Sequence, residues 1–339
     1  MKAYVLHGIN DFKLEYVPEP AISEGQVLVE VKAAGICGSD IPRVFTAGTY
    51  HYPLIPGHEF AGEVVKTMPE DEKLIGQRVG VFPLIPCMEC EQCKKRRYEM
   101  CSSYSYLGSR QDGGFAQYVA VPKRNLIPLT DNISYEAAAM MEPVSVALHA
   151  IRRINPKKDE TVAVCGLGTI GLSVVMLLKE MGIKDIIVFG NKEMQWNKAM
   201  ELGVPQSNLG LKDRPIDVFF ECVGSVETIQ WAVNLTAPAG RIMLVGNPKS
   251  DVDLPKDVYW KILRKQLTLM GTWNSSFMID GFQTFGSPDD WHYVAARLDE
   301  GRIDPTKLIT HRFGMGELMK GFEIMRDKSE EYIKVMGVF

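Results

Sequence analysis

Four cysteines stand close together in the 339-residue chain, and their spacing is that of a metal site. Two, two and seven residues separate them in turn: Cys87, Cys90, Cys93 and Cys101. Four thiolates so close in sequence can close the tetrahedron that structural zinc requires. An iron–sulfur cluster also takes four cysteines, but this spacing fits neither ferredoxin pattern. The stretch therefore predicts a structural zinc site.

A basic run, Lys94–Arg97, lies inside this cysteine stretch and leaves open a second interpretation, a zinc lobe that binds nucleic acid. The chain has 38 basic and 42 acidic residues and a formal net charge of −4, which gives no general basic field. Four adjacent charges on such a chain are more often a solvated loop. We therefore expect no nucleic-acid partner.

A second set of potential ligands is spread along the chain and mixes thiolate, imidazole and carboxylate: Cys37, His58, Glu59 and Glu142. Three protein ligands leave one position open for water or substrate, which a catalytic zinc requires. By spacing alone this set is weak. His58 follows Gly57 and could be a turn histidine, and Glu142 precedes Pro143 and could be a surface helix residue.

A glycine-rich turn, Gly166–Gly171, follows the β-branched run Thr161–Cys165 and opens a stretch of helical period. This order of strand, turn and helix is the context of a dinucleotide-binding fingerprint. The first glycine permits the turn, the second lets a pyrophosphate approach, and the third lets the helix pack on the strand. An ordinary crossover with a glycine-rich turn is the alternative. The cofactor would contact Gly166, Gly168, Thr169, Ile170 and Gly171.

The end of the next predicted strand bears on which cofactor binds. An acid about 20 residues past the glycine motif selects NAD, because it binds the ribose 2′-hydroxyl. Here the strand at 185–189 is followed by Gly190, Asn191 and Lys192. A 2′-phosphate would meet no repulsion there and could pair with the amide and the ammonium. The pattern favours NADP over NAD, unless Gly190 only makes a turn and Lys192 is solvated.

The elements that must position these residues fall into two groups. Strands expected at 161–165, 185–189, 217–222, 241–246 and 266–271, with helices between the earlier ones, predict a doubly wound parallel sheet. Val27, Val29 and Val31 alternate in a region of short antiparallel strands. Residues 134–153 have helical pattern, with Ser134 as N-cap and Pro143 as a break. A helix at 289–300 and a strand at 334–339 follow. Cys165 and Cys222 are expected to be buried strand residues.

Composition bounds the class of protein. Hydrophobic residues make up 46% and charged residues 24%, as in soluble globular chains. The apolar run 161–178 contains the three glycines and changes period, so we expect strand plus helix and no membrane span. The start of the chain has no apolar signal core. We therefore expect a cytoplasmic protein without a membrane partner, and zinc rather than disulfides at the clustered cysteines.

Five segments in order carry a family resemblance: 35–40 around Cys37, 56–62 around His58, the cysteine lobe (residues 87–101), 141–146 around Glu142, and the glycine motif. Together they resemble the polyol branch of the zinc-dependent medium-chain dehydrogenase/reductase family. The resemblance implies an α/β protein with a GroES-like, mostly-β catalytic domain at 1–152 and 275–339. A Rossmann domain at 153–274 would lie between these parts of the sequence, with the active site in the cleft.

The resemblance also implies roles for the scattered ligands. Cys37, His58 and Glu142 would hold catalytic zinc, with Glu59 as an alternating ligand or a ligand through water. Glu142 stands where alcohol dehydrogenases of the family have cysteine, which is a feature of polyol dehydrogenases. Ser39 would pass the substrate proton outward. Sorbitol dehydrogenases have histidine where this chain has Pro42, so any relay beyond the serine needs water or a cofactor ribose hydroxyl.

The chemistry that follows is hydride transfer between a secondary alcohol and NAD(P), with zinc as Lewis acid. The leading hypothesis is a polyol or polyol-phosphate dehydrogenase that forms a homodimer or homotetramer. A threonine-type or other small-alcohol dehydrogenase, or a ketone reductase, is the first alternative. A non-catalytic NADPH-binding redox sensor is a further one, although relatives of that kind lack zinc ligands that this chain has.

Three further segments, 39–45, 108–116 and 261–268, are similar to those of dehydrogenases of this branch that act on a polyol phosphate such as galactitol 1-phosphate. Two arginines in these segments, Arg43 and Arg110, are candidates to bind the phosphate, since a guanidinium can bind it through two hydrogen bonds. The alternative is that both arginines pair with nearby acids such as Asp40 and Asp112.

Overall fold

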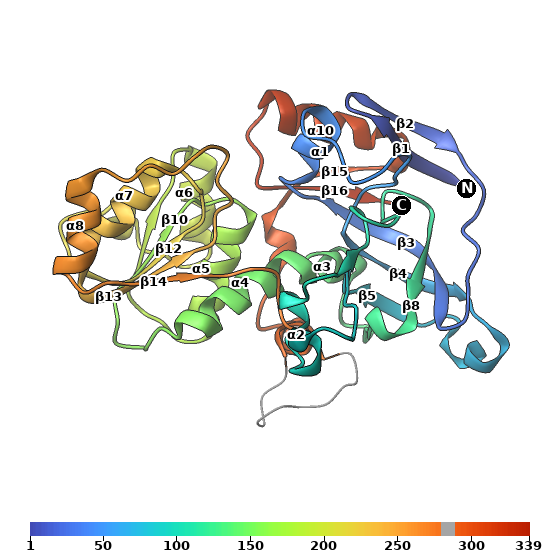
Figure 1. Cartoon of the computed structure of the whole chain (residues 1–339), viewed down its shortest axis with the longest axis horizontal. Coiled ribbons are helices and arrows are strands. Elements are labelled where there is room, and N and C mark those ends of the chain that lie inside the picture. The colour runs from blue at the N-terminus through green and yellow to red at the C-terminus, as the bar shows by residue number, and fades with distance from the viewer. Residues whose placement is uncertain (279–288) are drawn as a thin grey trace. The chain divides into compact units, whose positions relative to one another are not determined.

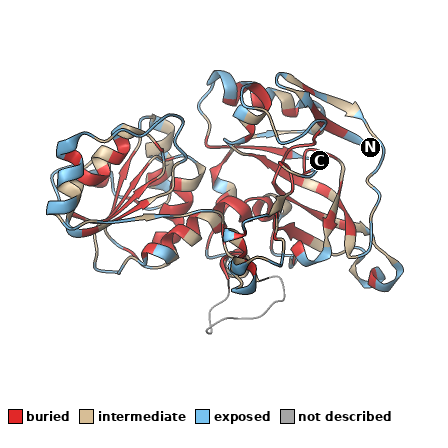
Figure 2. Cartoon of the chain, viewed as in Figure 1, coloured by how far each residue is buried: buried red, intermediate tan, exposed pale blue. Residues whose placement is uncertain are grey.

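The computed structural model describes residues 1–278 and 289–339, which divide into two compact units (Figure 1). The first unit combines residues 1–142 with 276–339, and the second comprises residues 143–275. Helix α4 (Met141–Ile154) contains the first boundary. Each unit has strands whose residues are mostly buried (Figure 2).

The second unit is built on a five-stranded sheet in which every pair of neighbours is parallel. Its order is β11 (Ile186–Phe189), β10 (Val162–Cys165), β12 (Ile216–Glu221), β13 (Thr236–Leu244) and β14 (Thr268–Gly271). The crossover helices are α5 (Thr169–Glu180), α6 (Glu193–Glu201), α7 (Val226–Leu235) and α8 (Lys256–Arg264). All four residues of β10 and of β11 are buried, as in strands with both faces covered. This confirms the predicted doubly wound sheet.

Strand β10 marks the point where the chain changes direction across this sheet. The chain passes from β10 through α5 to β11 on one side, and later adds β12 on the other side of β10. Ligands of open parallel sheets bind at the carboxyl ends of strands at such a point. The glycine motif directly follows β10, so the fold places it where a dinucleotide binds.

The first unit contains a seven-stranded sheet made from both ends of the chain. Its order is β15 (Ile309–Phe313), β16 (Lys334–Val338), β3 (Gln26–Ile36), β4 (Glu59–Lys66), β5 (Arg78–Val81) and β9 (Leu126–Pro128), with β8 (Tyr118–Pro122) paired to β3. The unit also contains two separate two-stranded antiparallel sheets: β1 (Lys2–Gly8) with β2 (Asp11–Tyr16), and β6 (Leu84–Ile85) with β7 (Ser105–Tyr106). The helices are α1 (Asp40–Phe45), α2 (Glu91–Lys94), α3 (Tyr135–Ala139), α9 (Asp290–Asp299) and α10 (Leu318–Asp327). Val27, Val29 and Val31 are buried in its core, as their alternation predicts.

Three sequence expectations need correction. The helical stretch from Ser134 breaks at Met140 and not at Pro143, because Pro143 lies in the first turn of α4, where its missing N–H costs nothing. Strand β13 begins at Thr236 instead of residue 241, since the chain leaves α7 directly into it. Cys222 follows β12 and is only partly buried, whereas Cys165 is 2% exposed within β10.

No helix among residues 1–278 and 289–339 has the length and apolarity to cross a membrane.

Candidate active site and structural metal centre

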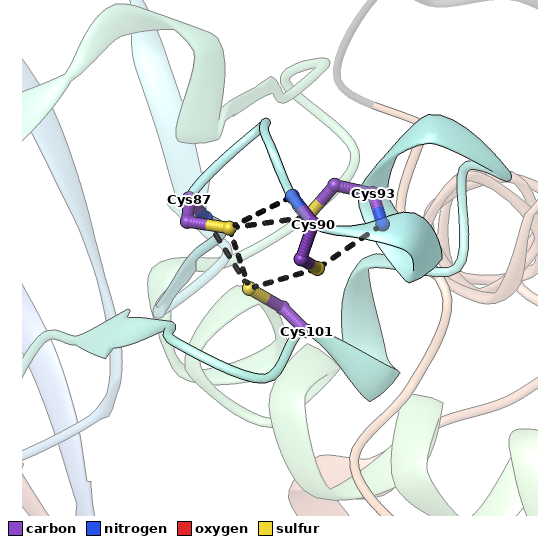
Figure 3. A group of neighbouring side chains, drawn as sticks. All are labelled: Cys87, Cys90, Cys93 and Cys101. Atoms are coloured by element: carbon purple, nitrogen blue, oxygen red, sulfur yellow. Dashed lines mark hydrogen bonds between the residues drawn. The ribbon is translucent and has the colours of Figure 1, made fainter.

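The four lobe cysteines converge around one point (Figure 3). The Sγ atoms of Cys87 and Cys101 are 3.4 Å apart, those of Cys87 and Cys93 3.9 Å, and those of Cys90 and Cys101 4.0 Å. Tetrahedral zinc with Zn–S bonds of about 2.3 Å needs sulfurs about 3.8 Å apart. All four are free thiols, so the group fits a zinc ion and forms no disulfide.

Local backbone explains how the lobe favours thiolates. The N–H of Cys90 donates to Cys87 Sγ at 3.4 Å, and the N–H of Cys93 donates to Cys90 Sγ at 3.5 Å. N–H groups of Ser102 and Cys93 lower the pKa of Cys90 to about 5. Burial raises the pKa of Cys93 to about 12, so this thiol needs a cation nearby to ionise at neutral pH.

Three of the four scattered ligands meet in the first unit, and Glu142 is not in this group. The ligand atoms of Cys37, His58 and Glu59 all lie within 4.8 Å of one another. Cys37 follows β3 and Glu59 begins β4, and these strands pair with Gly35 opposite Glu59. A Cβ at Gly35 would overlap the Glu59 carboxylate and the Lys334 side chain. The glycine two residues before Cys37 therefore leaves the space in which the cluster forms.

Glu142 lies beside this cluster, in the first turn of α4. Its Oε1 accepts a hydrogen bond of 3.1 Å from Tyr106, whose ring centroid is 5.8 Å from that of His58. Burial raises the pKa of Glu142 to about 7, with His58 acting in the opposite direction and Glu59 adding to the rise. Burial, together with Glu142, also raises the pKa of Tyr106 well above its usual value. Tyr106 belongs to the site although the sequence did not single it out.

Asp40 connects the cluster to Arg43. Its carboxylate is fully buried, pairs with the Arg43 guanidinium and accepts the N–H of Cys37 at 3.0 Å. Nδ1 of His58 lies 3.6 Å from Asp40 Oδ1 and has no hydrogen-bond partner among the described residues. Burial would lower the pKa of His58, but Asp40 and Cys37 raise it well above its usual value. Arg43 thus pairs with Asp40, as one alternative of the sequence analysis had it.

Lys334 is a second member of the site that sequence reasoning missed. It comes from β16, near the end of the chain, and its ammonium pairs with the Glu59 carboxylate and donates to Ile36 O at 3.1 Å. Burial would lower its pKa, but Glu59 and Cys37 raise it. One thiol and two carboxyl groups thus lie together with one imidazole and one ammonium. Such a set of donors suits a divalent cation.

Ser39 and Cys37 lie at the accessible side of the cluster. Cys37 is partly exposed, whereas His58 and Glu59 are buried. Ser39 is exposed, and its hydroxyl makes no capping hydrogen bond to α1. The arrangement can hold a metal ion that a ligand reaches from one side.

The glycine motif has the geometry of its expected roles. Gly166 has a φ of +94°, which favours glycine, and a Cβ at Gly171 would overlap the Gly166 carbonyl. A Cβ at Gly168 would meet nothing within 4 Å, so this side of the turn is open. Helix α5 begins at Thr169, and Gly168 has no side chain to cap it. An anion is the natural partner of its first N–H groups.

The residues expected to contact the cofactor ribose follow β11. Gly190 comes directly after the strand, and the N–H of Asn191 donates to Gln195 Oε1 at 3.4 Å. Lys192 is the N-cap residue of α6, and the first acid past the strand is Glu193. Gly190 to Lys192 therefore place an amide and an ammonium, and no carboxylate, immediately beyond β11.

Arg110 does not pair with Asp112. It donates from Nη1 to Tyr104 O at 2.7 Å and from Nη2 to the Tyr50 hydroxyl at 3.3 Å. Asp112 accepts instead the N–H of Ile55 at 2.9 Å. The two candidate arginines thus differ: Arg43 is paired with an acid, and Arg110 is held by neutral groups.

Comparison with known proteins agrees with both halves of this description. Residues 23–131 match the alcohol dehydrogenase GroES-like domain, and residues 169–291 match the zinc-binding dehydrogenases. Galactitol 1-phosphate 5-dehydrogenase of Escherichia coli K12 is 32% identical over 85% of this chain and 86% of its own length. Sorbitol dehydrogenase of Bacillus subtilis is 29% identical over 99% of this chain and 96% of its own.

Solved structures of dehydrogenases also match this chain over its whole length. Galactitol-1-phosphate dehydrogenase from Escherichia coli matches with a TM-score of 0.88 and 28% identity over the whole of both chains. An alcohol dehydrogenase from E. coli CFT073 complexed with NADH has a TM-score of 0.88 and 26% identity, over 100% of this chain and 99% of that one. A zinc-binding dehydrogenase from Sinorhizobium meliloti bound to NADP has the same score and coverage at 25% identity.

Proposed function

The chain belongs to the zinc-dependent medium-chain dehydrogenases, and we propose that it oxidises a secondary alcohol of a polyol or polyol phosphate, reversibly, with NADP. The observation that carries this is the convergence of Cys37, His58 and Glu59 within 4.8 Å, with Glu142 adjacent. A carboxylate at position 142, where a thiolate would make a softer site, supports a polyol as substrate.

We assign Cys37, His58 and Glu142 as ligands of a catalytic zinc, with Glu59 as an alternating ligand or a ligand through water. Cys87, Cys90, Cys93 and Cys101 would hold a structural zinc, which gives two zinc ions per chain. When bound, the catalytic zinc would supply a Lewis acid for the substrate hydroxyl, and the nicotinamide would supply the hydride acceptor.

The chain's own residues would orient these ligands. Asp40 faces Nδ1 of His58, which would leave Nε2 for the metal, and Asp40 also pairs with the Arg43 guanidinium. Tyr106 holds the Glu142 carboxylate through its hydroxyl. Ser39, exposed next to Asp40, would take the substrate proton toward solvent.

NADP would lie along the glycine turn. Gly166, Gly168, Thr169, Ile170 and Gly171 would contact the pyrophosphate, and Gly190, Asn191 and Lys192 the ribose phosphate. The catalytic domain would comprise residues 1–152 and 275–339, which include Glu142, and the nucleotide domain would comprise residues 153–274. None of the seven cysteines forms a disulfide, which supports a reducing, cytoplasmic location.

We also propose that the enzyme forms a homodimer or homotetramer. Strand β14 is an edge strand, and its residues are mostly exposed. Large apolar side chains on α8, on β14 and just after β14 are 37–56% exposed: Tyr259, Trp260, Leu263, Leu269 and Trp273. An edge with unpaired backbone groups and apolar neighbours suits a second copy. Light scattering would give the mass.

The proposed function is tested by zinc analysis and a substrate panel. Purified protein should contain about two zinc per chain, and it should reduce NADP with one or more free or phosphorylated polyols. Threonine and a simple secondary alcohol serve as controls for the alternative activities. Zinc at the cysteine lobe alone, with no turnover of any alcohol, would contradict the proposal and favour a redox sensor.

A further inference from the structure

The guanidinium of Arg110 lies between two aromatic rings. Its Cζ is 4.4 Å from the ring centroid of Tyr50 and 4.4 Å from that of Tyr104. The hydrogen bonds to Tyr104 O and the Tyr50 hydroxyl use two of its five N–H donors, so three remain. The Arg110 carbonyl is itself 3.2 Å from His51 Nε2. The side chain and its backbone are therefore held in place before any ligand arrives.

The charge of Arg110 has no acidic partner in residues 1–278 and 289–339. This distinguishes it from Arg43, whose side chain is 16% exposed and paired with buried Asp40. Arg110 itself is half-buried, and Tyr50 is 70% exposed, so an anion in solution can reach the group. A planar cation held between rings, with donors to spare, is suited to bind an oxyanion through two hydrogen bonds.

Ring contacts join this guanidinium to the metal-ligand cluster. The Tyr104 ring centroid is 6.1 Å from that of Tyr106, and Tyr106 contacts both the His58 ring and the Glu142 carboxylate. All of these residues belong to the first unit. One ligand with an anion at one end and a hydroxyl further along its chain could contact both places.

We propose that Arg110, held between Tyr50 and Tyr104, binds the phosphate of a phosphorylated polyol and selects it over the free polyol. This inference rests on the proposed function for the reaction at the other end of the substrate. It selects between the two arginines of the sequence analysis: Arg110 contacts the phosphate, and Arg43 positions Asp40.

The test compares Arg110→Gln, Arg110→Lys and Arg78→Gln with the unmodified enzyme. Arg78 is the control, because it also lies over a tyrosine ring (Tyr135, 4.6 Å) and donates to backbone carbonyls. Unlike Arg110, it also has an acidic neighbour, with Nη1 3.6 Å from Asp131 Oδ1. The probes are galactitol 1-phosphate, galactitol, and L-galactonate, whose anion is a carboxylate. Arg110→Gln should raise KM for galactitol 1-phosphate about ten- to a hundredfold, as expected for loss of charged hydrogen bonds.

The other probes and variants serve as controls. In Arg110→Gln, KM for galactitol should change less than about threefold. Arg110→Lys should recover part of the loss for galactitol 1-phosphate, because it keeps the charge without the planar fork. Arg78→Gln should leave KM for galactitol 1-phosphate unchanged. An equal rise for galactitol and its phosphate would overturn the proposal in favour of a structural role. A rise confined to L-galactonate would overturn it in favour of a carboxylate.

A binding measurement separates this inference from the proposed function. Galactitol 1-phosphate should raise the melting temperature of the unmodified protein and of Arg78→Gln, but not of Arg110→Gln. If that holds while no polyol is oxidised, the proposed function fails and the phosphate site stands. If Arg110→Gln does not fold, Tyr50→Phe decides, since it removes one hydrogen bond to the guanidinium. It should raise KM for the phosphate alone about threefold, and no change would overturn the proposal.

Discussion

The ammonium of Lys334 and the carboxylate of Glu59 form a buried ion pair, although 275 residues separate them in sequence. Each side chain is 2% exposed. The pair lies beside Cys37 and fills the space that Gly35 leaves open. Because the ammonium neutralises Glu59, it decides how strongly that carboxylate can compete for a metal held by the neighbouring ligands.

Replacing Lys334 with Met should therefore destabilise the protein, since it leaves the Glu59 carboxylate buried without its cation. We expect the free energy of unfolding to fall by about 3–5 kcal/mol, measured by denaturant titration. The double variant Lys334→Met with Glu59→Gln should recover most of the loss. Lys123→Met is the control, because its pair with Asp71 is 45% and 11% exposed, and it should cost much less stability than Lys334→Met. A loss for Lys334→Met as small as the control's would refute this account.

The two metal sites should respond differently to loss of a ligand. Cys37→Ser or His58→Ala should abolish turnover and leave a folded protein, because the cluster can be emptied without opening the cysteine lobe. Cys93→Ser should lower the melting temperature, since zinc binding also orders the lobe. Activity, melting temperature and zinc content of all three variants check this. A stable, active Cys93→Ser protein would rule out a structural zinc there.

The cofactor preference should follow the residues after β11. The unmodified enzyme should have the higher kcat/KM with NADP, because Gly190 presents no carboxylate to the 2′-phosphate. Gly190→Asp should shift the ratio of kcat/KM values toward NAD by about tenfold or more, by repelling the phosphate and binding the 2′-hydroxyl. A Cβ there would lie 3.0 Å from Leu167 Cδ1 and 3.2 Å from Gln195 Oε1, both ends of flexible side chains. A native preference for NAD would contradict the prediction.

Glu142 should make the zinc-free protein less stable as pH rises. Its folded-state pKa of about 7 lies above the ordinary value of 4.5, so between these values the folded protein keeps a proton that the unfolded chain has lost. The free energy of unfolding then falls with rising pH in that window, by up to about 1.4 kcal/mol per unit. Glu142→Gln should flatten this dependence while still accepting the Tyr106 hydrogen bond. An unchanged slope in denaturation series from pH 5 to 8 would disprove it.

The sequence by itself determined the features whose parts lie close along the chain. Cys87, Cys90 and Cys93 come together through turns in which the N–H three residues on donates to a sulfur. Cys101 follows eight residues later, and its sulfur accepts the N–H of Cys87, so the spacing of the four was enough to predict that they converge. The glycine motif likewise depends on a strand, a turn and a helix that are adjacent. Alternating valines and apolar runs predicted the two kinds of sheet, because one or both faces of each strand are buried.

Tertiary structure decided what depends on distant segments. Lys334 carries no motif, and only the pairing of β16 with β3 brings it to Glu59. Arg43 and Arg110 were equivalent candidates in the sequence, since each is a cation beside an acid. In the folded protein Arg43 forms an ion pair with Asp40, whereas the ring of Tyr50, 60 residues away in sequence, lies against the Arg110 guanidinium. The physical reason is that local spacing limits which neighbours are possible, whereas burial and the packing of remote strands and loops select the contacts that form.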